Sequence, residues 1–311
     1  MLHNFYLSIT LLFLLFVAST QVFASDTVRV FILAGQSNMV GAGEVESNPS
    51  RNDGKGSLQW LTENLSTKDT YSDLKADTGA WVQRDDVLIW FLNRNGPLKP
   101  GYGSNQKKLG PELGFGWVVG DAFEEPVLLI KLAWGGKSLA EDFRPPSLEG
   151  DTGPYYVEVI ETTKEILNTA DQLFPELKDK TFELTGFGWH QGWNDRINQS
   201  FNDAYEKNMI QFIKDVRRDL QKPTLPFVIA ETGMSGLEEK HPRALALMAS
   251  QKAVADYPDF NGNVAFVPTQ EFYRPPEDSP SKQAYHWNNN AETYYLIGEH
   301  MAHAMIRLIK P

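Results

Sequence analysis

The sequence predicts an α/β fold in which a parallel sheet lies between two layers of helices. Three observations predict it: short apolar runs rich in β-branched residues, segments of helical period between most of them, and small or polar residues directly after several runs. Strands that alternate with helices imply βαβ units, whose right-handed crossovers make a doubly wound sandwich the simplest topology. Ligands bind at the C-terminal edge of such sheets, so we look for function there.

Five apolar runs are predicted as strands, because buried parallel strands are short, apolar and bounded by turn residues. They are Val28–Ala34, Val127–Ala133, Phe182–Trp189, Phe227–Glu231 and Val264–Val267. Five segments with apolar residues at helical spacing are predicted as helices. They are Glu112–Phe123, Tyr156–Phe174, Ala204–Leu220, Arg243–Tyr257 and Ala291–Ile309.

Residues 41–110 depart from this alternation. The stretch is rich in Asn, Asp, Gly and Ser and contains short apolar islands such as Val87–Leu92. Loops this long inside a compact domain are usually functional, so we expect a substrate-facing wall or lid. An insertion without a role in the chemistry is the alternative.

The first 24 residues resemble a secretory signal. Residues 9–17 are almost wholly apolar, and Val22-Phe23-Ala24 places small residues where a signal peptidase cleaves. We expect cleavage after Ala24, a secreted or periplasmic protein, and no stable membrane association afterwards. A retained anchor is the alternative, although the run is shorter than the ~20 residues of a spanning helix. Residues 25–311 are then predicted to form one domain.

Composition excludes several classes of function. The formal net charge of −11 argues against binding to nucleic acid or to anionic membranes. The chain has no cysteine, which rules out disulfides, thiolate metal sites and cysteine nucleophiles. A secreted chain without disulfides must rely on its hydrophobic core, which suits a large domain.

Two glycine-containing segments follow predicted strands. Gly35-Gln36-Ser37-Asn38 ends the first strand and can expose Ser37 as a nucleophile, although a serine there is more often a turn or helix-cap residue. Trp134-Gly135-Gly136-Lys137-Ser138 follows the second strand. Paired glycines expose backbone N–H groups that can stabilise an oxyanion, and a plain tight turn is the alternative.

Two further segments supply amide and imidazole side chains. Trp189-His190-Gln191-Gly192-Trp193-Asn194-Asp195 follows the third strand, where Gln191 or Asn194 could donate to developing negative charge. Ordinary turn and cap chemistry is the alternative for Asp195. Tyr285-His286-Trp287-Asn288 precedes the last predicted helix, and His286 suits a general base, with an ordinary pKa of about 6.5.

These four blocks, in this order, resemble the SGNH (GDSL-like) hydrolase superfamily, and more narrowly the sialate O-acetylesterase-like carbohydrate esterases. The resemblance extends from Val28 to about Ile309 and includes Gly-Gln-Ser-Asn-Met at residues 35–39 and Gly-x-Asn-Asp at residues 192–195. It implies a three-layer α/β/α sandwich with a five-stranded parallel, flavodoxin-like sheet. The absence of a Gly-x-Ser-x-Gly elbow argues against the α/β-hydrolase fold.

The resemblance also implies roles for individual residues. Ser37 would attack an ester carbonyl and His286 would accept its proton. The oxyanion would be held by the N–H groups of Ser37 and Gly136 and by the side chain of Asn194 or Gln191, between which the sequence does not choose. No cofactor or metal is implied.

One position departs from the superfamily pattern, which usually has an aspartate three residues before the histidine. Gln283 stands there in this chain. Asp278 or Glu277 could orient His286 instead, with Asp278 the preferred candidate, or a backbone carbonyl could orient the ring of a Ser–His dyad.

The expected function is therefore a secreted serine esterase that removes O-acetyl groups from a carbohydrate, such as an acetylated polysaccharide or sialic acid. The acidic charge, the abundant aromatic residues and the polar insertion favour a soluble polar substrate. Two alternatives stay open: a non-catalytic carbohydrate-binding protein on the same fold, and a short-chain esterase acting on non-sugar esters.

Overall fold

A seven-stranded sheet forms the centre of the computed structural model, which describes residues 25–310. The strand order is β4-β3-β6-β1-β7-β8-β9. All neighbouring strands pair in parallel except β3 and β4. The strands are β1 (Thr27–Gly35), β3 (Arg84–Phe91), β4 (Arg94–Leu98), β6 (Val127–Ala133), β7 (Thr181–His190), β8 (Phe227–Ala230) and β9 (Val264–Val267).

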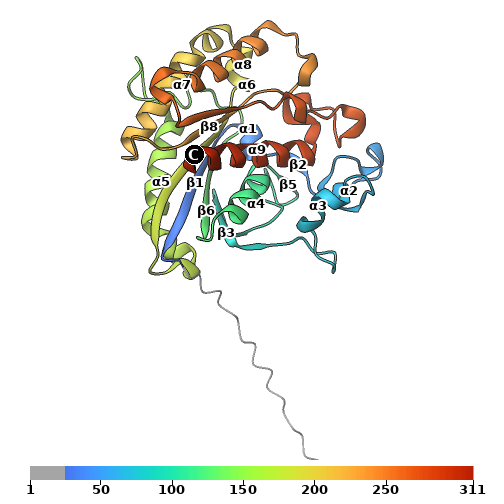
Figure 1. Cartoon of the computed structure of the whole chain (residues 1–311). Helices are drawn as coiled ribbons and strands as arrows, with labels where there is room; N and C mark the ends of the chain where they lie inside the picture. The colour runs from blue at the N-terminus through green and yellow to red at the C-terminus, as the bar shows by residue number, and fades with distance from the viewer. Residues whose placement is uncertain (1–24, 311) are drawn as a thin grey trace, which may run out of the picture.

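Helices cover both faces of the sheet (Figure 1), which makes the fold a three-layer α/β/α sandwich. The helices α4 (Glu112–Ala122) and α9 (Ala291–Ile309) pack on one face, and α5 (Pro154–Leu173), α7 (Gln199–Asp219) and α8 (Pro242–Ala255) on the other. Successive side chains of β1 point to opposite faces of the sheet, so the strand contributes to the hydrophobic core on each face. Phe31 and Leu33 face α4 and α9, whereas Val30 and Ile32 face the opposite helix layer. The predicted fold class is confirmed, as are the five predicted strands and the five predicted helices.

The insertion differs from the expectation of a long excursion, because part of it extends the sheet beyond the five expected strands. The apolar island at Val87–Phe91 lies in β3, which pairs in parallel with β6, and β4 returns antiparallel along the edge. The remaining short elements are α1 (Ser37–Val40), α2 (Leu58–Glu63), α3 (Lys68–Tyr71), α6 (Trp193–Ile197) and a ribbon of β2 (Gly43–Glu44) with β5 (Lys108–Leu109). Within residues 25–310, no helix combines the length and apolarity needed to cross a bilayer. The predicted signal, residues 1–24, lies outside the described residues.

A fully buried ion pair fixes the insertion to the sheet. Lys131, on β6, donates from Nζ to Glu112 Oε2 at 2.6 Å, to the Val40 carbonyl at 2.8 Å and to the Tyr102 carbonyl at 2.8 Å. The other Glu112 oxygen accepts from the Gly110 N–H at 2.8 Å. Burial lowers the pKa of Lys131, and Glu112 opposes that change. One ammonium group thus links the end of α1, the insertion and the start of α4.

Replacing Lys131 with Met should lower the free energy of unfolding by about 3–5 kcal/mol, because it leaves the Glu112 carboxylate buried without its cation. Urea unfolding of the wild type and the variant measures this difference. The double variant Lys131→Met/Glu112→Leu is the control and should recover much of the loss, since both charges are then absent. A single variant as stable as the wild type would contradict the importance of this pair.

Candidate active site

Ser37 lies directly beyond the C-terminal end of β1, as the first residue of α1. The turn before it requires glycine, because a Cβ on Gly35 would lie 2.2 Å from the His190 carbonyl oxygen of the neighbouring strand. This close approach allows the Gln36 N–H to donate to the same carbonyl at 3.2 Å. Among the described residues, the Ser37 N–H has no hydrogen-bond acceptor, so it is free to bind a ligand.

Gln36 links the nucleophile segment to the loop after β7. Its buried side chain accepts from the Gly192 N–H at 3.1 Å and the Asn194 N–H at 3.3 Å, and it donates to Asn194 Oδ1 at 3.2 Å. Asn194 in turn donates from Nδ2 to the Gly136 carbonyl at 2.8 Å. Gln36, the residue before Ser37, is therefore connected to Asn194 and Gly136 through a chain of hydrogen bonds.

The Gly135-Gly136 turn is exposed and faces open space. No heavy atom lies within 4 Å of where a Cβ would stand on either glycine, and Gly136 has a φ of +70°. In the described part of the chain, the Gly136 N–H donates to no other residue. Asp195 holds the following loop by accepting from the N–H groups of Leu139 and Ala140 at 2.8 and 3.0 Å. Burial raises the pKa of Asp195 to about 6, although these bonds favour its charged form.

Gln191 does not fit the role of oxyanion donor. Its side chain is 1% exposed, and its amide nitrogen donates to Asp195 at 2.6 Å and to the Lys137 carbonyl at 3.0 Å. Both N–H groups are thus used inside the protein. Asn194, by contrast, has one N–H directed to Gly136 and a second that binds no described residue. Of the two side chains that the sequence left open, the geometry favours Asn194.

Asn38 attaches the histidine loop to the nucleophile segment. Its Nδ2 donates to the Tyr285 carbonyl at 3.1 Å, and its Oδ1 accepts from the Tyr294 hydroxyl, on α9, at 2.8 Å. The same hydroxyl is 3.3 Å from the His286 carbonyl. Ser37 and His286 are each next in sequence to one partner of the Asn38–Tyr285 bond, so the structure places the two residues in one region.

His286 is half-buried, and its ring lies 4.6 Å from that of Tyr285, between centroids. Burial, and then the nearby charge of Lys108, hold the pKa of His286 below its ordinary value. Its ring is therefore neutral at neutral pH, as a general base requires. His190 is buried, stacks on Trp287 and has a pKa lowered by burial to about 4, so it fits the role of general base less well than the half-buried His286.

The two carboxylates proposed to orient His286 lie elsewhere. Asp278 is exposed and pairs with Lys55 Nζ at 3.1 Å, and Glu277 is also exposed. Within residues 25–310, no carboxylate forms a hydrogen bond with the His286 ring. Proximity in sequence suggested these acids, but the 3-10 turn at Pro276–Asp278 presents them to solvent. The preference for Asp278 is therefore corrected.

Sequence reasoning missed three contributors to this geometry: the cross-links by Gln36 and Asn38, and the charge of Lys108, which pairs with Glu44 beside the histidine loop. The signal for the first two was present, since two amides flank Ser37. Lys108 is distant in sequence and could not be recognised. In the described residues, no group of three or more His, Asp or Glu side chains could hold a metal ion.

Taken together, the site offers a hydroxyl, a neutral imidazole, two free backbone N–H groups and one free amide N–H at the C-terminal edge of the sheet. Such a set can attack a carbonyl carbon and stabilise the charge that develops on its oxygen.

Comparison with known proteins identifies relatives of this chain and the family to which it belongs. A probable carbohydrate esterase of Arabidopsis thaliana is 24% identical over 204 residues, which are 64% of this chain and 67% of that protein. The crystal structure of an Arabidopsis thaliana protein superposes with a TM-score of 0.58 at 18% identity, covering 89% of this chain and 97% of that one, and it supports the fold.

A carbohydrate acetylesterase from Xanthomonas citri is a more distant likeness, with a TM-score of 0.49 at 13% identity, covering 90% of this chain and 56% of that one. The family model described as carbohydrate esterase, sialic acid-specific acetylesterase, matches residues 27–307. This match covers nearly all described residues, including Ser37, Gly136, Asn194 and His286. The chain therefore belongs to the sialic acid-specific acetylesterase family of carbohydrate esterases.

Proposed function

We propose that this protein is a serine esterase that removes O-acetyl groups from carbohydrates. The observation that supports it most is the pair of hydrogen-bonded links through Gln36–Asn194–Gly136 and Asn38–Tyr285, which gather the four sequence blocks around Ser37. Membership of a carbohydrate esterase family supports the substrate class. The Tyr285 ring, 42% exposed and 5.7 Å from that of Trp193, adds an aromatic surface beside His286 on which a sugar can stack.

In the proposed reaction, Ser37 Oγ attacks the acetyl carbonyl while His286 accepts the hydroxyl proton. The N–H groups of Ser37 and Gly136 and the free N–H of Asn194 hold the oxyanion. His286 then protonates the departing sugar hydroxyl, and water releases acetate from Ser37 by the reverse sequence. Because no described carboxylate binds the His286 ring, we propose a Ser–His dyad.

We expect Ser37→Ala and His286→Ala each to reduce acetate release by at least about 10³-fold, since each removes a group that bonds with or transfers protons to the substrate. The measurement is acetate release from a panel of acetylated polysaccharides and acetylated sialic acid. Asp278→Asn and Glu277→Gln are the matched controls and should stay within about twofold of the wild type, because both side chains are exposed.

Two results would contradict the proposal. A large loss of acetate release in the Asp278→Asn variant would restore that residue as the acid that orients His286. A folded wild type that releases no acetate from any substrate but binds acetylated glycans would favour the carbohydrate-binding alternative.

Replacing Lys108 with Gln should move the acid limb of the kcat/KM profile to higher pH. The Lys108 charge disfavours protonation of His286, so its removal raises the pKa of His286, and more of the base is protonated at a given acidic pH. Lys107→Gln is the matched control, because Lys107 is exposed and makes no ion pair with a described residue. An unmoved limb in Lys108→Gln would mean that His286 is not the titrating base.

We also propose that residues 1–24 direct export and are removed, which gives a secreted or periplasmic enzyme. Expression of the full chain in a host with a secretion pathway should yield an exported protein beginning at Ser25, as read by N-terminal sequencing. A protein that keeps Met1 and remains with the membrane fraction would favour the retained anchor.

A further inference from the structure

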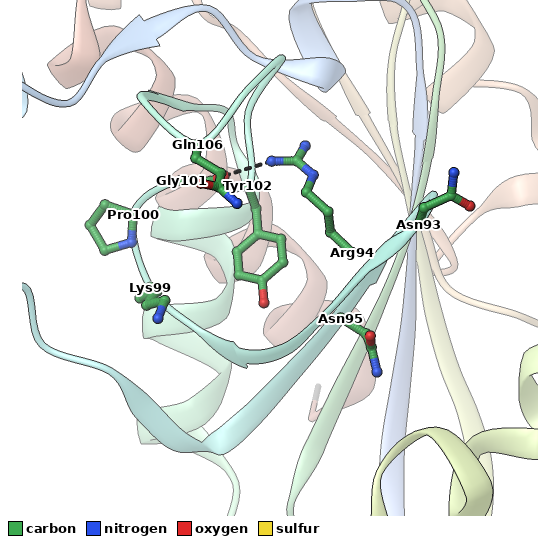
Figure 2. A pocket seen from close by; sticks show the side chains of 8 residues that line it. All are labelled: Asn93, Arg94, Asn95, Lys99, Pro100, Gly101, Tyr102 and Gln106. Carbon is green, nitrogen blue, oxygen red and sulfur yellow. Dashed lines mark hydrogen bonds between the residues drawn. The ribbon is translucent and has the colours of Figure 1, made fainter.

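A polar cavity of about 500 Å³ lies between the β3–β4 turn and the loop that follows β4. Its volume is in the range of small-ligand sites. Figure 2 shows Arg94 reaching from β4 toward Gly101 and Tyr102, whereas Asn93 and Asn95 point to the other side of the strand. Asn93, Asn95 and Gln106 also line it, although the Asn95 amide is directed to the other face of the strand, where it donates to the Leu173 carbonyl at 3.1 Å.

The charge of this cavity is opposite to that of the chain. The protein has 40 acidic and 29 basic residues, yet the cavity lining contains two cations, Arg94 and Lys99, and no carboxylate. Lys99 is exposed and forms no ion pair with a described residue. An acidic protein that keeps a local positive site can attract an anion there and repel it elsewhere.

Arg94 is held in position without a counter-ion. Its guanidinium donates to the Gly101 carbonyl at 2.7 Å and to the Gly103 carbonyl, and it lies 5.0 Å from the Phe91 ring centroid. In residues 25–310 it makes no ion pair with a carboxylate. The two carbonyl bonds leave three of its five N–H donors, and a fixed guanidinium binds an anion at a smaller entropic cost than a mobile one.

The Arg94 end of the cavity lies toward the same edge of the sheet as Ser37, because Arg94 pairs with Phe91, whereas Lys99 follows Leu98, which pairs with Arg84 at the start of β3. Phe91, Lys131 and Leu33 occupy one row across β3, β6 and β1. The segments that come after β3, β6 and β1 therefore lie at the same edge of the sheet. They are the turn after β3, the Gly135-Gly136 turn and the segment that contains Ser37. Two strand spacings separate β3 from β1, which is about 10 Å. A glycan lying along this edge can extend from Ser37 to the cavity.

We propose that this cavity binds a carboxylate-bearing sugar unit that flanks the acetylated unit of the same glycan, with Arg94 contacting the carboxylate and Lys99 adding positive charge to the same cavity. The planar guanidinium matches a carboxylate in two-point contact, and the Gln106 amide can bind a hydroxyl group of the sugar. This inference rests on the proposed function for the position of the ester, but the binding itself does not require ester cleavage.

The test is isothermal titration calorimetry of the full mature protein with an unacetylated trigalacturonate, with the neutral galactotriose as matched ligand. We expect trigalacturonate to bind at least tenfold more tightly than the neutral trisaccharide. Lys99→Gln should weaken its binding by about threefold or more, and Arg94→Gln by about tenfold or more. Lys107→Gln removes the same charge from an exposed residue outside the cavity and should leave the affinity unchanged.

Lys99→Gln keeps the assignment testable if Arg94→Gln fails to fold, because Lys99 makes no ion pair with a described residue. Equal affinity for the acidic and neutral trisaccharides, or the same loss in Lys107→Gln as in Lys99→Gln, would overturn the proposal. Inorganic phosphate that binds as tightly as trigalacturonate would indicate a site for small anions and also overturn it. Loss of acetate release with intact trigalacturonate binding would count against the esterase and leave this site standing.

Discussion

The buried pair of Lys131 and Glu112 is the contact on which the arrangement of the site depends. A lysine in the middle of a buried parallel strand is costly unless all three of its protons find acceptors. Here they bind a carboxylate, the carbonyl that ends the helix of Ser37, and a carbonyl of the insertion. These partners come from three separate segments, so satisfying one charge fixes the nucleophile helix and the wall beside it relative to the sheet.

A second level of order comes from amide side chains. Gln36 and Asn38, on either side of Ser37, bind two different loops, and Asn194 binds a third. Each amide is both donor and acceptor, which lets it join segments whose backbones cannot pair directly. The motif around Ser37 is therefore more than a turn that exposes a hydroxyl: its neighbours assemble the site.

The sequence could predict the fold because its strands are buried on both faces and its helices have one apolar face. Ser37, Gly136, His286 and the pair Asn194 and Gln191 could be named as candidates from their places at element ends, and their roles stay predictions. The added strands β3 and β4 were missed, because their short apolar core stands in a polar stretch. The choice between Asn194 and Gln191, and the positions of Asp278 and Glu277, depend on side-chain direction and tertiary contacts, which sequence spacing does not determine.

The backbone just after His286 has a consequence for heat tolerance. Trp287, Asn288 and Asn289 all have left-handed φ angles, between 50° and 59°, which a tryptophan rarely adopts. The intrinsic backbone preferences of these three residues do not favour left-handed φ angles. This geometry depends on anchors such as the buried Trp287 ring and the bond from Asn289 to the Ala42 carbonyl. Such segments open locally at lower free energy than a sheet. We therefore expect the working temperature of the site to be set by this short loop, below the melting temperature of the sandwich that supports it.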